Sequence, residues 1–419
     1  MNSILTVRKS TAGKALSRTA YLAILGVVVL IIGACSSGGS SASSSAAAAA
    51  PSAAAAAPSA AAAESASSAD PAASDALAAA QAAVDAALVR PTELPFLELP
   101  AKPEPGGVID VIACGVPSCQ QFADIVQEAV APLGWEVKFL NAGVTAKDLA
   151  AAYDQAVRDN PDGVIGTGGA NPLLVAKQLK KLADAGIPVV MQYASVDEPL
   201  EGLTAIVYGS QAAEANGKLL GQKILVDSGG KDAHVLYVGT PEVANNFKWT
   251  RTGARSVLEA PGACENCSSG DLDMTLASIG TKLPGVFISY LRANPEINYV
   301  VGDFGDVIGG FPQALEQAGL ADKVKLLANG VGAIQADYLK KGQMLAAAYN
   351  PNLEILWTDA GVILAHQQGV DLGLDAKNEV AAIPPMLITP ENVVIPPADG
   401  YWPMIENYQD LFAQAWKNS

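Results

Sequence analysis

The sequence predicts an α/β fold with two doubly wound parallel-sheet lobes, preceded by a disordered tether. From Gly107 onward, short continuous apolar runs alternate with amphipathic stretches of helical spacing, as in parallel sheets whose two faces are covered by helices. The alternation occurs as two successive series, which indicates two lobes. Residues 36–90 consist mostly of Ser, Ala, Pro and Gly and contain no aromatic residue. Such a segment cannot bury enough apolar surface to offset the entropy of ordering.

The composition argues against two classes of function, nucleic-acid binding and metal binding by histidines. The 419 residues include 26 Lys and Arg against 42 Asp and Glu, a formal net charge of −16. A nucleic-acid partner needs a concentrated basic surface, so none is expected. The sequence has two histidines, His234 and His366, which argues against a histidine-built metal site. We therefore expect neither a metal nor a cofactor.

The first 34 residues are typical of a secretory signal peptide. A basic start precedes an apolar run, Tyr21–Ile32, that is shorter than the roughly 20 residues needed to span a bilayer. The sequence Ile32-Gly33-Ala34-Cys35 resembles the lipobox of bacterial lipoproteins. This resemblance implies cleavage before Cys35 and attachment of lipid such as palmitate, which anchors the protein on the extracytoplasmic face of the cell membrane. The alternative is an ordinary signal peptide, or an uncleaved anchor, with a chance cysteine.

Residues 35–100 form the expected linker between this anchor and the folded part. As a flexible coil, residues 36–90 would span on the order of 40 Å. The alanine-rich stretch Asp75–Arg90 is a marginal helix former. We interpret the linker as a tether that lifts the folded part off a membrane or through a wall; the alternative is a spacer without function.

Each series follows the order of strand and helix. In the first series the predicted strands are 108–113, 136–140, 163–166 and 187–192, and the helices are 120–133, 145–159 and 172–185. In the second series the predicted strands are 204–208, 234–238, 298–302 and 325–328, and the helices are 211–228, 248–259 and 308–319. Ligands of open parallel sheets bind at the carboxyl ends of the strands. The residues at these ends are polar, glycine-rich and aromatic, and they lack a paired acid and base, so we expect a binding protein and not an enzyme.

Four stretches of the chain resemble type I solute-binding proteins. They are Pro161-Asp-Gly-Val-Ile165, Gly186-Ile-Pro-Val-Val190, Ala314–Gly319 with Val324–Leu327, and Leu387–Val393. The resemblance covers roughly residues 107–395 and is greatest to the sugar-binding branch, the ribose- and galactose-type receptors of ABC importers. It implies two lobes joined by three crossing segments, with 106–209 plus 350–388 in lobe one and 210–349 plus 389–419 in lobe two.

The resemblance also implies a function and its partners. The lobes would close on a small-molecule ligand, and ABC permease subunits in the membrane would recognise the closed monomer. A ligand-sensing receptor domain of the same fold, signalling to a membrane partner, is the alternative. An exported enzyme is a third possibility, but it would need a nucleophile and base that we do not find. The export signal and the lack of a helix-turn-helix exclude a gene regulator.

The predicted ligand site differs from that of simple-sugar receptors in being less charged and more aromatic. Where that family commonly has an Asp-Arg pair, this chain has Gln192-Tyr193-Ala194. The residues expected to stack on a ligand ring are Tyr193, Trp249, Phe304 and Tyr349, and those expected to bind its polar edges are Gln192, Asp306 and Asn329. Each aromatic could instead pack in the core or the hinge. A sugar, a polyol or a ring-bearing metabolite is the predicted ligand.

Four cysteines follow Cys35, namely Cys114, Cys119, Cys264 and Cys267. An even count in an exported chain favours disulfides. Of the three pairings, we favour the local one, 114–119 and 264–267, because a cross pairing would tie the lobes together. An all-cysteine zinc site and thioredoxin-like chemistry are weaker alternatives. At the C-terminus, an apolar stripe from Tyr401 to Trp416 indicates core docking, with a partner surface as the alternative.

Overall fold

The computed structural model describes residues 71–93, 95, 97–113, 115, 121–241, 247–396 and 400–418. The predicted signal peptide, the lipidation site Cys35, most of the linker, and Cys114 and Cys119 lie outside the described residues. Among the helices in the described ranges, none is long and apolar enough to cross a membrane.

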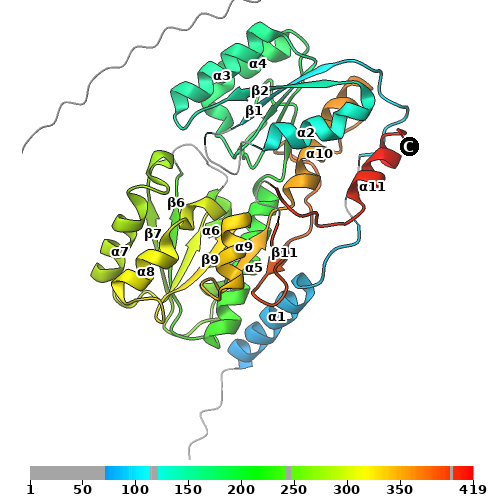
Figure 1. Cartoon of the computed structure of the whole chain (residues 1–419). Coiled ribbons are helices and arrows are strands. Elements are labelled where there is room, and N and C mark those ends of the chain that lie inside the picture. The colour runs from blue at the N-terminus through cyan, green and yellow to red at the C-terminus, as the bar shows by residue number, and fades with distance from the viewer. Residues whose placement is uncertain are drawn as a thin grey trace, which may run out of the picture. The chain divides into compact units, whose positions relative to one another are not determined.

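The first lobe is a five-stranded, wholly parallel sheet of order β2-β1-β3-β4-β5 (Figure 1). The strands are β1 (Val108–Ala113), β2 (Glu136–Asn141), β3 (Gly163–Gly166), β4 (Val189–Gln192) and β5 (Ala205–Val207). Helices α3 (Ala146–Asp159) and α4 (Ala176–Asp184) pack on one face, and α2 (Phe122–Val130) and α10 (Asn352–Gln367) on the other. Because both faces are covered, β1, β3, β4 and β5 are almost fully buried and read as largely apolar runs in the sequence, whereas the edge strand β2 exposes four of its six residues.

The second lobe is a six-stranded sheet of order β11-β10-β9-β8-β6-β7. Its strands are β6 (His234–Gly239), β7 (Ser268–Asp273), β8 (Tyr299–Gly302), β9 (Lys325–Asn329), β10 (Ala346–Tyr349) and β11 (Met386–Ile388). All neighbours are parallel except β11, which pairs antiparallel with β10. The pleat directs Val235 and Tyr237 to one face and Leu236 and Val238 to the other, as strand geometry requires.

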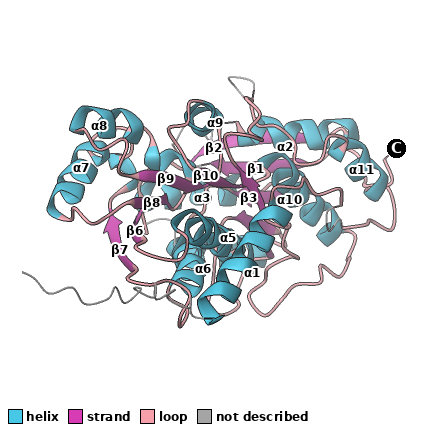
Figure 2. Ribbon diagram, turned by 90° about the horizontal axis from the view of Figure 1, so that it is seen from below, coloured by secondary structure: helices cyan, strands magenta, loops and turns pink. Residues whose placement is uncertain are grey.

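Three helices cover each face of the second sheet (Figure 2). One face carries α5 (Ser210–Ser228), α6 (Phe247–Leu258) and α1 (Pro71–Ala87), and the other carries α7 (Leu283–Ala293), α8 (Phe311–Ala318) and α9 (Ala333–Lys340). The predicted α/β fold with two doubly wound lobes is thus confirmed.

Close contact between α5 and α6 depends on glycines. A Cβ at Gly217 of α5 would lie 2.0 Å from the carbonyl oxygen of Thr250, and a Cβ at Gly253 of α6 would lie 2.1 Å from that of Glu214. Only glycine allows the two backbones to approach this closely. The crossing brings Asn216 of α5 beside α6, where its side chain contributes to the network described below.

The chain passes between the two sheets at three places, as expected for this fold. The first crossing follows β5 at Tyr208 and Gly209, the second follows β10 at Asn350, and the third is the segment 368–385 between α10 and β11. The third segment lies against the first, since Ile206 N–H donates to the Asn378 carbonyl at 2.7 Å and Val380 N–H donates to that of Ile206 at 3.0 Å.

The predicted boundaries of the lobes need correction at two points. Residues 386–388 were expected in lobe one, but β11 extends the second sheet, because its backbone pairs with the free edge of β10. Residues 389–419 were expected in lobe two, yet α11 (Tyr408–Ala415) packs on the first lobe. There Trp416 stacks on Trp357 of α10 with ring centroids 5.6 Å apart, so the C-terminal aromatic stripe is core.

The segment predicted as linker also contributes to the fold. Its residues 71–87 form the helix α1, which buries Ala80, Val84 and Ala87 in the apolar cluster beneath α5 and β11. The marginal helix propensity of this alanine-rich stretch is therefore supplemented by tertiary packing.

Candidate functional site

The candidate site lies where the carboxyl ends of the two sheets approach each other. Asp197 follows β4 in the first lobe and Lys248 stands at the start of α6 in the second, and their side chains form an ion pair of 3.1 Å. Both side chains are largely exposed, so the pair contributes little stability. It does place the loop after β4 beside the start of α6, and these two elements carry predicted site residues.

Gln192, the last residue of β4, is fully buried. Its side-chain amide has neither a donor nor an acceptor partner among the described residues. A buried amide without partners is costly, because its bonds to water are lost without replacement. The position of Gln192 at a strand end therefore suits a residue whose partner is a ligand.

Tyr193 has a different environment from the one predicted. Its backbone has a φ of 53°, a conformation that is strained for a tyrosine. The ring meets Tyr208 edge to face, and the hydroxyl donates to Asn352 Oδ1 at 2.5 Å. Burial raises the pKa of Tyr193 well above its usual value, so the phenol stays protonated as a donor. Tyr193 thus ties the end of β4 to the start of α10 in the hinge.

A network of amides centred on Asn216 connects the hinge to the second lobe. Asn216 Nδ2 lies 2.8 Å from Asn329 Oδ1, 2.9 Å from Asn350 Oδ1 and 3.0 Å from the Tyr208 hydroxyl. Asn329 Nδ2 in turn donates to Thr250 Oγ1 at 3.0 Å. Asn329, predicted to bind ligand, thus has protein partners for its oxygen and its nitrogen, and it joins β9 to α5 and α6.

Trp249 of α6 is half-buried, and its ring is close to two ammonium groups. Lys377 Nζ lies 4.2 Å and Lys248 Nζ 5.2 Å from the ring centroid, distances typical of cation–π contacts. The indole Nε1 is buried and has no partner within the described part of the chain. Trp249 is therefore better suited to donate a hydrogen bond from its edge than to offer both faces for stacking.

The start of α6 is held by a buried ionic cluster. Arg251 donates to both oxygens of Asp303 at 2.7–3.1 Å and also pairs with Asp271 and Asp273 at 3.0 and 2.8 Å. Burial alone lowers the pKa of Arg251, but the bonds to Asp303 and Asp273 outweigh it and raise the pKa. The guanidinium therefore stays charged and is fully occupied by protein carboxylates, which fixes α6 to the ends of β7 and β8.

The remaining predicted residues of the second lobe are Phe304 and Asp306. Phe304 and Asp306 are both partly buried in the loop after β8, where Asp306 lies in the short helix Gly305–Ile308 and Phe304 packs on the core.

Thr240, directly after β6, is fully buried, and its hydroxyl has no partner among the residues described. Thr240 joins Gln192 and Trp249 as a neutral polar group at a strand or helix end with no partner in the part of the chain that the structure describes.

Tyr349 lies in the core and is not accessible for stacking on a ligand. It is fully buried, its ring stacks on Trp402 at a centroid distance of 4.8 Å, and its hydroxyl donates to the Trp402 carbonyl. The C-terminal segment that contains Trp402 covers it. Tyr349 therefore has a packing role, which corrects the expectation that it stacks on the ligand.

The start of α5 is capped from a distant segment. Glu379, in the third crossing, accepts hydrogen bonds from the N–H groups of Ser210 at 2.7 Å and Gln211 at 3.0 Å, and from the Ser210 hydroxyl. These are the first two residues of α5. A carboxylate at this position satisfies unpaired N–H groups and interacts favourably with the helix dipole.

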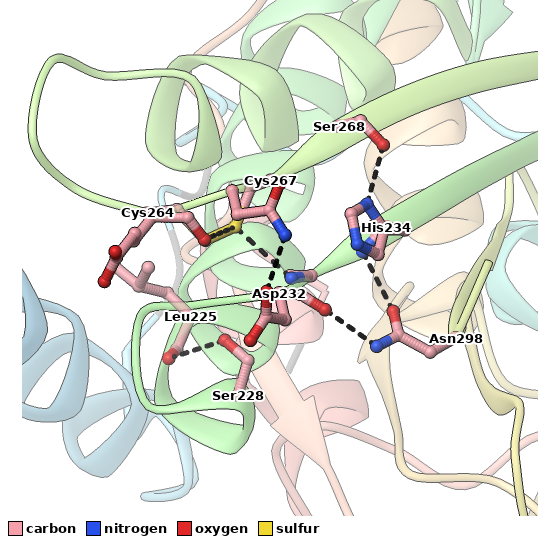
Figure 3. Close-up of a disulfide and its surroundings, with 11 residues drawn as sticks. Leu225, Ser228, Asp232, His234, Cys264, Cys267, Ser268 and Asn298 are labelled. Carbon is pink, nitrogen blue, oxygen red and sulfur yellow. Dashed lines mark hydrogen bonds between the residues drawn. A yellow bond between two sulfur atoms is a disulfide. The ribbon is translucent and has the colours of Figure 1, made fainter. Parts of the chain in front are cut away.

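The disulfide lies at the opposite edge of the second sheet (Figure 3). Cys264 and Cys267 are joined, and Cys267 Sγ accepts from Ala233 N–H at 3.3 Å, just before β6 begins. In Figure 3 the side chains of His234 and Ser268, 2.8 Å apart, connect the first residues of β6 and β7. The bridge thus supports strand starts, away from the candidate site. Within the described residues, no cluster of three or more His, Cys, Asp or Glu could hold a metal.

Sequence reasoning did not single out Asn216, Thr250, Arg251 or Glu379. One available signal was Asn216-Gly217 in the middle of a long predicted helix, because both residues are poor helix formers. The others carry no local signal, since their partners are distant in the sequence.

Comparison with known proteins assigns the chain to a family. Residues 115–366 match the family model described as the periplasmic binding protein domain. This range exceeds half of the 419 residues, so the chain belongs to that family, and the resemblance to type I solute-binding proteins is confirmed. A search of curated proteins found no match.

Solved structures share the fold at low sequence identity. The glucose-galactose binding protein GanP of Geobacillus stearothermophilus is 16% identical with a TM-score of 0.58, covering 69% of this chain and 99% of its own. A solute-binding protein of Agrobacterium vitis with bound α-D-tagatopyranose is 18% identical (TM-score 0.57; 69% and 97% covered). One of Bacillus halodurans C-125 with bound myo-inositol is 19% identical (TM-score 0.55; 70% and 98% covered). At these identities the likeness establishes the fold alone.

Proposed function

We propose that this protein is an extracytoplasmic solute-binding protein of an ABC importer, which closes its two lobes on a small, uncharged polar ligand such as a sugar or polyol. The observation that carries the proposal is that three buried polar groups, the Gln192 amide, the Thr240 hydroxyl and Trp249 Nε1, have no hydrogen-bond partner among the described residues. They occur at the carboxyl side of strands or at a helix start in both lobes of a fold that belongs to a binding family.

The chemistry of these groups favours a neutral ligand. An amide, a hydroxyl and an indole N–H offer both donors and acceptors, which matches hydroxyl groups. Two of the nearby cations are paired with protein carboxylates, Arg251 with three of them and Lys248 with Asp197, whereas the Lys377 ammonium lies over the Trp249 ring and bonds the Ser210 hydroxyl at 3.4 Å. A charged ligand would need an unpaired countercharge at this place. The bound monosaccharide and cyclitol in two of the structural neighbours are ligands of the same class.

A thermal-shift screen tests the ligand class. The folded part, residues 71–419, is titrated with sugars, polyols, nucleosides, amino acids and aromatic acids. A ligand at about a hundredfold over its dissociation constant adds roughly 2.7 kcal/mol to the free energy of unfolding. Stabilisation within the sugars or polyols is expected, whereas stabilisation by a charged amino acid alone would contradict the proposal.

The residues are tested by a matched pair of variants. Gln192→Ala should weaken the binding of the ligand found, while Gln317→Ala, at an exposed position of α8, should leave it unchanged. Equal affinities of the two variants would remove Gln192 from the site.

Membrane anchoring and importer partnership form the second half of the proposal. The lipobox-like sequence before Cys35 supports a lipid anchor, which a palmitate analogue should label in the full chain but not in Cys35→Ser. Co-purification of the lipidated protein with a permease and its ATPase supports import. Co-purification with a receptor kinase would instead favour the sensing alternative.

A further inference from the structure

The N-terminal extension makes a connection between the two lobes that is separate from the three crossings. Its helix α1 is part of the second lobe, where Ala80, Val84 and Ala87 complete the apolar cluster formed by α5, α6 and the sheet. In Figure 1 the chain then continues from α1 toward α11 and the first lobe. The matched family range begins only at residue 115, so this extension lies outside it.

The end of the extension is fixed to the first lobe by hydrogen bonds from its backbone to backbone and side-chain groups of that lobe. Leu99 N–H donates to the carbonyl of Ala415 at 2.9 Å, and the Glu104 carbonyl accepts from Trp135 Nε1 at 2.8 Å. Ala101 exchanges two bonds with the side chain of Gln368, at 3.1 and 3.3 Å, where α10 ends. Leu99 is also fully buried in the apolar cluster of this lobe.

We propose that residues 71–105 are a strap that docks one end on each lobe and thereby restricts the range of lobe orientations. The two docked ends are separated by residues 88–96, which reach at most about 35 Å when fully extended. Lobe rotation that moves the ends farther apart than this reach must detach an end, and smaller rotations must rearrange the link. Detaching α1 would expose Val84 and its neighbours on α5 to water, which opposes it.

The strap is distinct from the hinge itself. The hinges of two-lobe proteins absorb lobe motion through changes in a few backbone torsion angles. In this protein the three crossings contain the residues that form the hinge. The strap instead adds a restraint whose strength depends on the docking of α1. This inference goes beyond the proposed function, because it concerns the ligand-free protein and does not depend on the identity of the solute.

Distance measurements between two spin labels by double electron–electron resonance, made on the ligand-free protein, test whether the strap restricts lobe orientation. Spin labels are placed at Ala183→Cys on α4 and Gln317→Cys on α8, both exposed positions in different lobes. The protein without the two added cysteines, treated with the same label, gives the background signal that comes from the native cysteines. The distribution of label distances is then compared between the parent protein and variants of the strap.

Val84→Lys places a charge in the buried face of α1, whereas Ala82→Lys makes the same charge change on its exposed face. We expect a broader distance distribution for Val84→Lys and an unchanged one for Ala82→Lys. A twelve-residue Gly/Ser insertion after Val89, ahead of the ion pair between Arg90 and Glu406, lengthens the link without altering either docked end, and it should broaden the distribution as well.

A distribution of unchanged width in the insertion variant would overturn the strap, even if Val84→Lys proved too unstable to measure. Because no ligand is present, this result would leave the proposed solute binding unaffected. Conversely, failure of the ligand screen would not alter the outcome of the distance measurement.

Discussion

The carboxylate of Glu379 accepts hydrogen bonds from both the backbone N–H and the hydroxyl of Ser210, 169 positions earlier in the chain. The contact joins the third crossing segment to the helix that begins directly after the first. Two crossings are therefore held together at the point where the chain enters the second lobe, and lobe movement must either keep this contact or break it.

Removing the carboxylate should destabilise the protein. Glu379 is buried and satisfies two N–H groups at the start of α5, and bonds to a charged group contribute about 1.5–3 kcal/mol each. We expect Glu379→Gln, which keeps one acceptor, to lower the free energy of unfolding by about 1–3 kcal/mol, measured by urea denaturation. Glu296→Gln, at an exposed position, is the control, and an equal small effect in both would show that the cap contributes little.

Asp303 should be needed for both stability and ligand binding. Its buried carboxylate neutralises Arg251 and so holds α6, which carries Trp249, against the end of β8. Breaking a buried ion pair by removing one partner costs about 3–5 kcal/mol. Asp303→Asn should lower the unfolding midpoint in urea and weaken ligand binding, while Asp322→Asn on the surface should do neither. Full affinity in Asp303→Asn would mean that the cluster does not position the site.

The pH dependence of stability should have a component from Glu354. This carboxyl group on α10 is buried, and burial raises its pKa from 4.5 to about 7, although it accepts from Ile405 N–H at 3.0 Å. The folded state therefore favours the protonated form. Its contribution is fully present below pH 4.5 and is lost as the pH rises toward 7, by at most about 1.4 kcal/mol per pH unit.

Glu354→Gln removes this titration but keeps an acceptor for Ile405. Stability measured between pH 4 and 8 should fall more steeply for the parent protein than for the variant between pH 4.5 and 7, with a constant difference above that range. Parallel curves would show that Glu354 titrates near its usual pKa.

The indole N–H of Trp249 should contribute to ligand affinity. Trp249→Phe keeps an aromatic ring beside Lys377 but removes a donor that has no partner among the described residues. Because a neutral hydrogen bond contributes about 0.5–1.5 kcal/mol, the dissociation constant should rise about 2- to 13-fold by calorimetry. Tyr299→Phe, which removes a hydroxyl at the start of β8 that bonds Asp227, should leave it unchanged. An unaltered affinity for Trp249→Phe would exclude Nε1 as a ligand donor.

The sequence by itself determined the order and type of most elements up to β9, although it did not predict β7 or α7. Apolar runs such as Val108–Ala113 can be read because a strand covered on both faces buries nearly all of its side chains, here all except Val108. The alternation with amphipathic helices then predicted both lobes, and the strand ends predicted where to look for Gln192. These are local properties, set by the period of side chains along each element.

Only the tertiary structure decided which of the predicted site residues are available to a ligand. Tyr349 and Asn329 follow the same sequence logic as Gln192, yet Trp402 covers the first and Asn216 bonds the second. Likewise α1 has only marginal propensity as a peptide, and the packing of Val84 on the second lobe gives it a defined place. Such contacts join residues far apart in the chain, so their formation depends on how the elements pack and no local pattern encodes it.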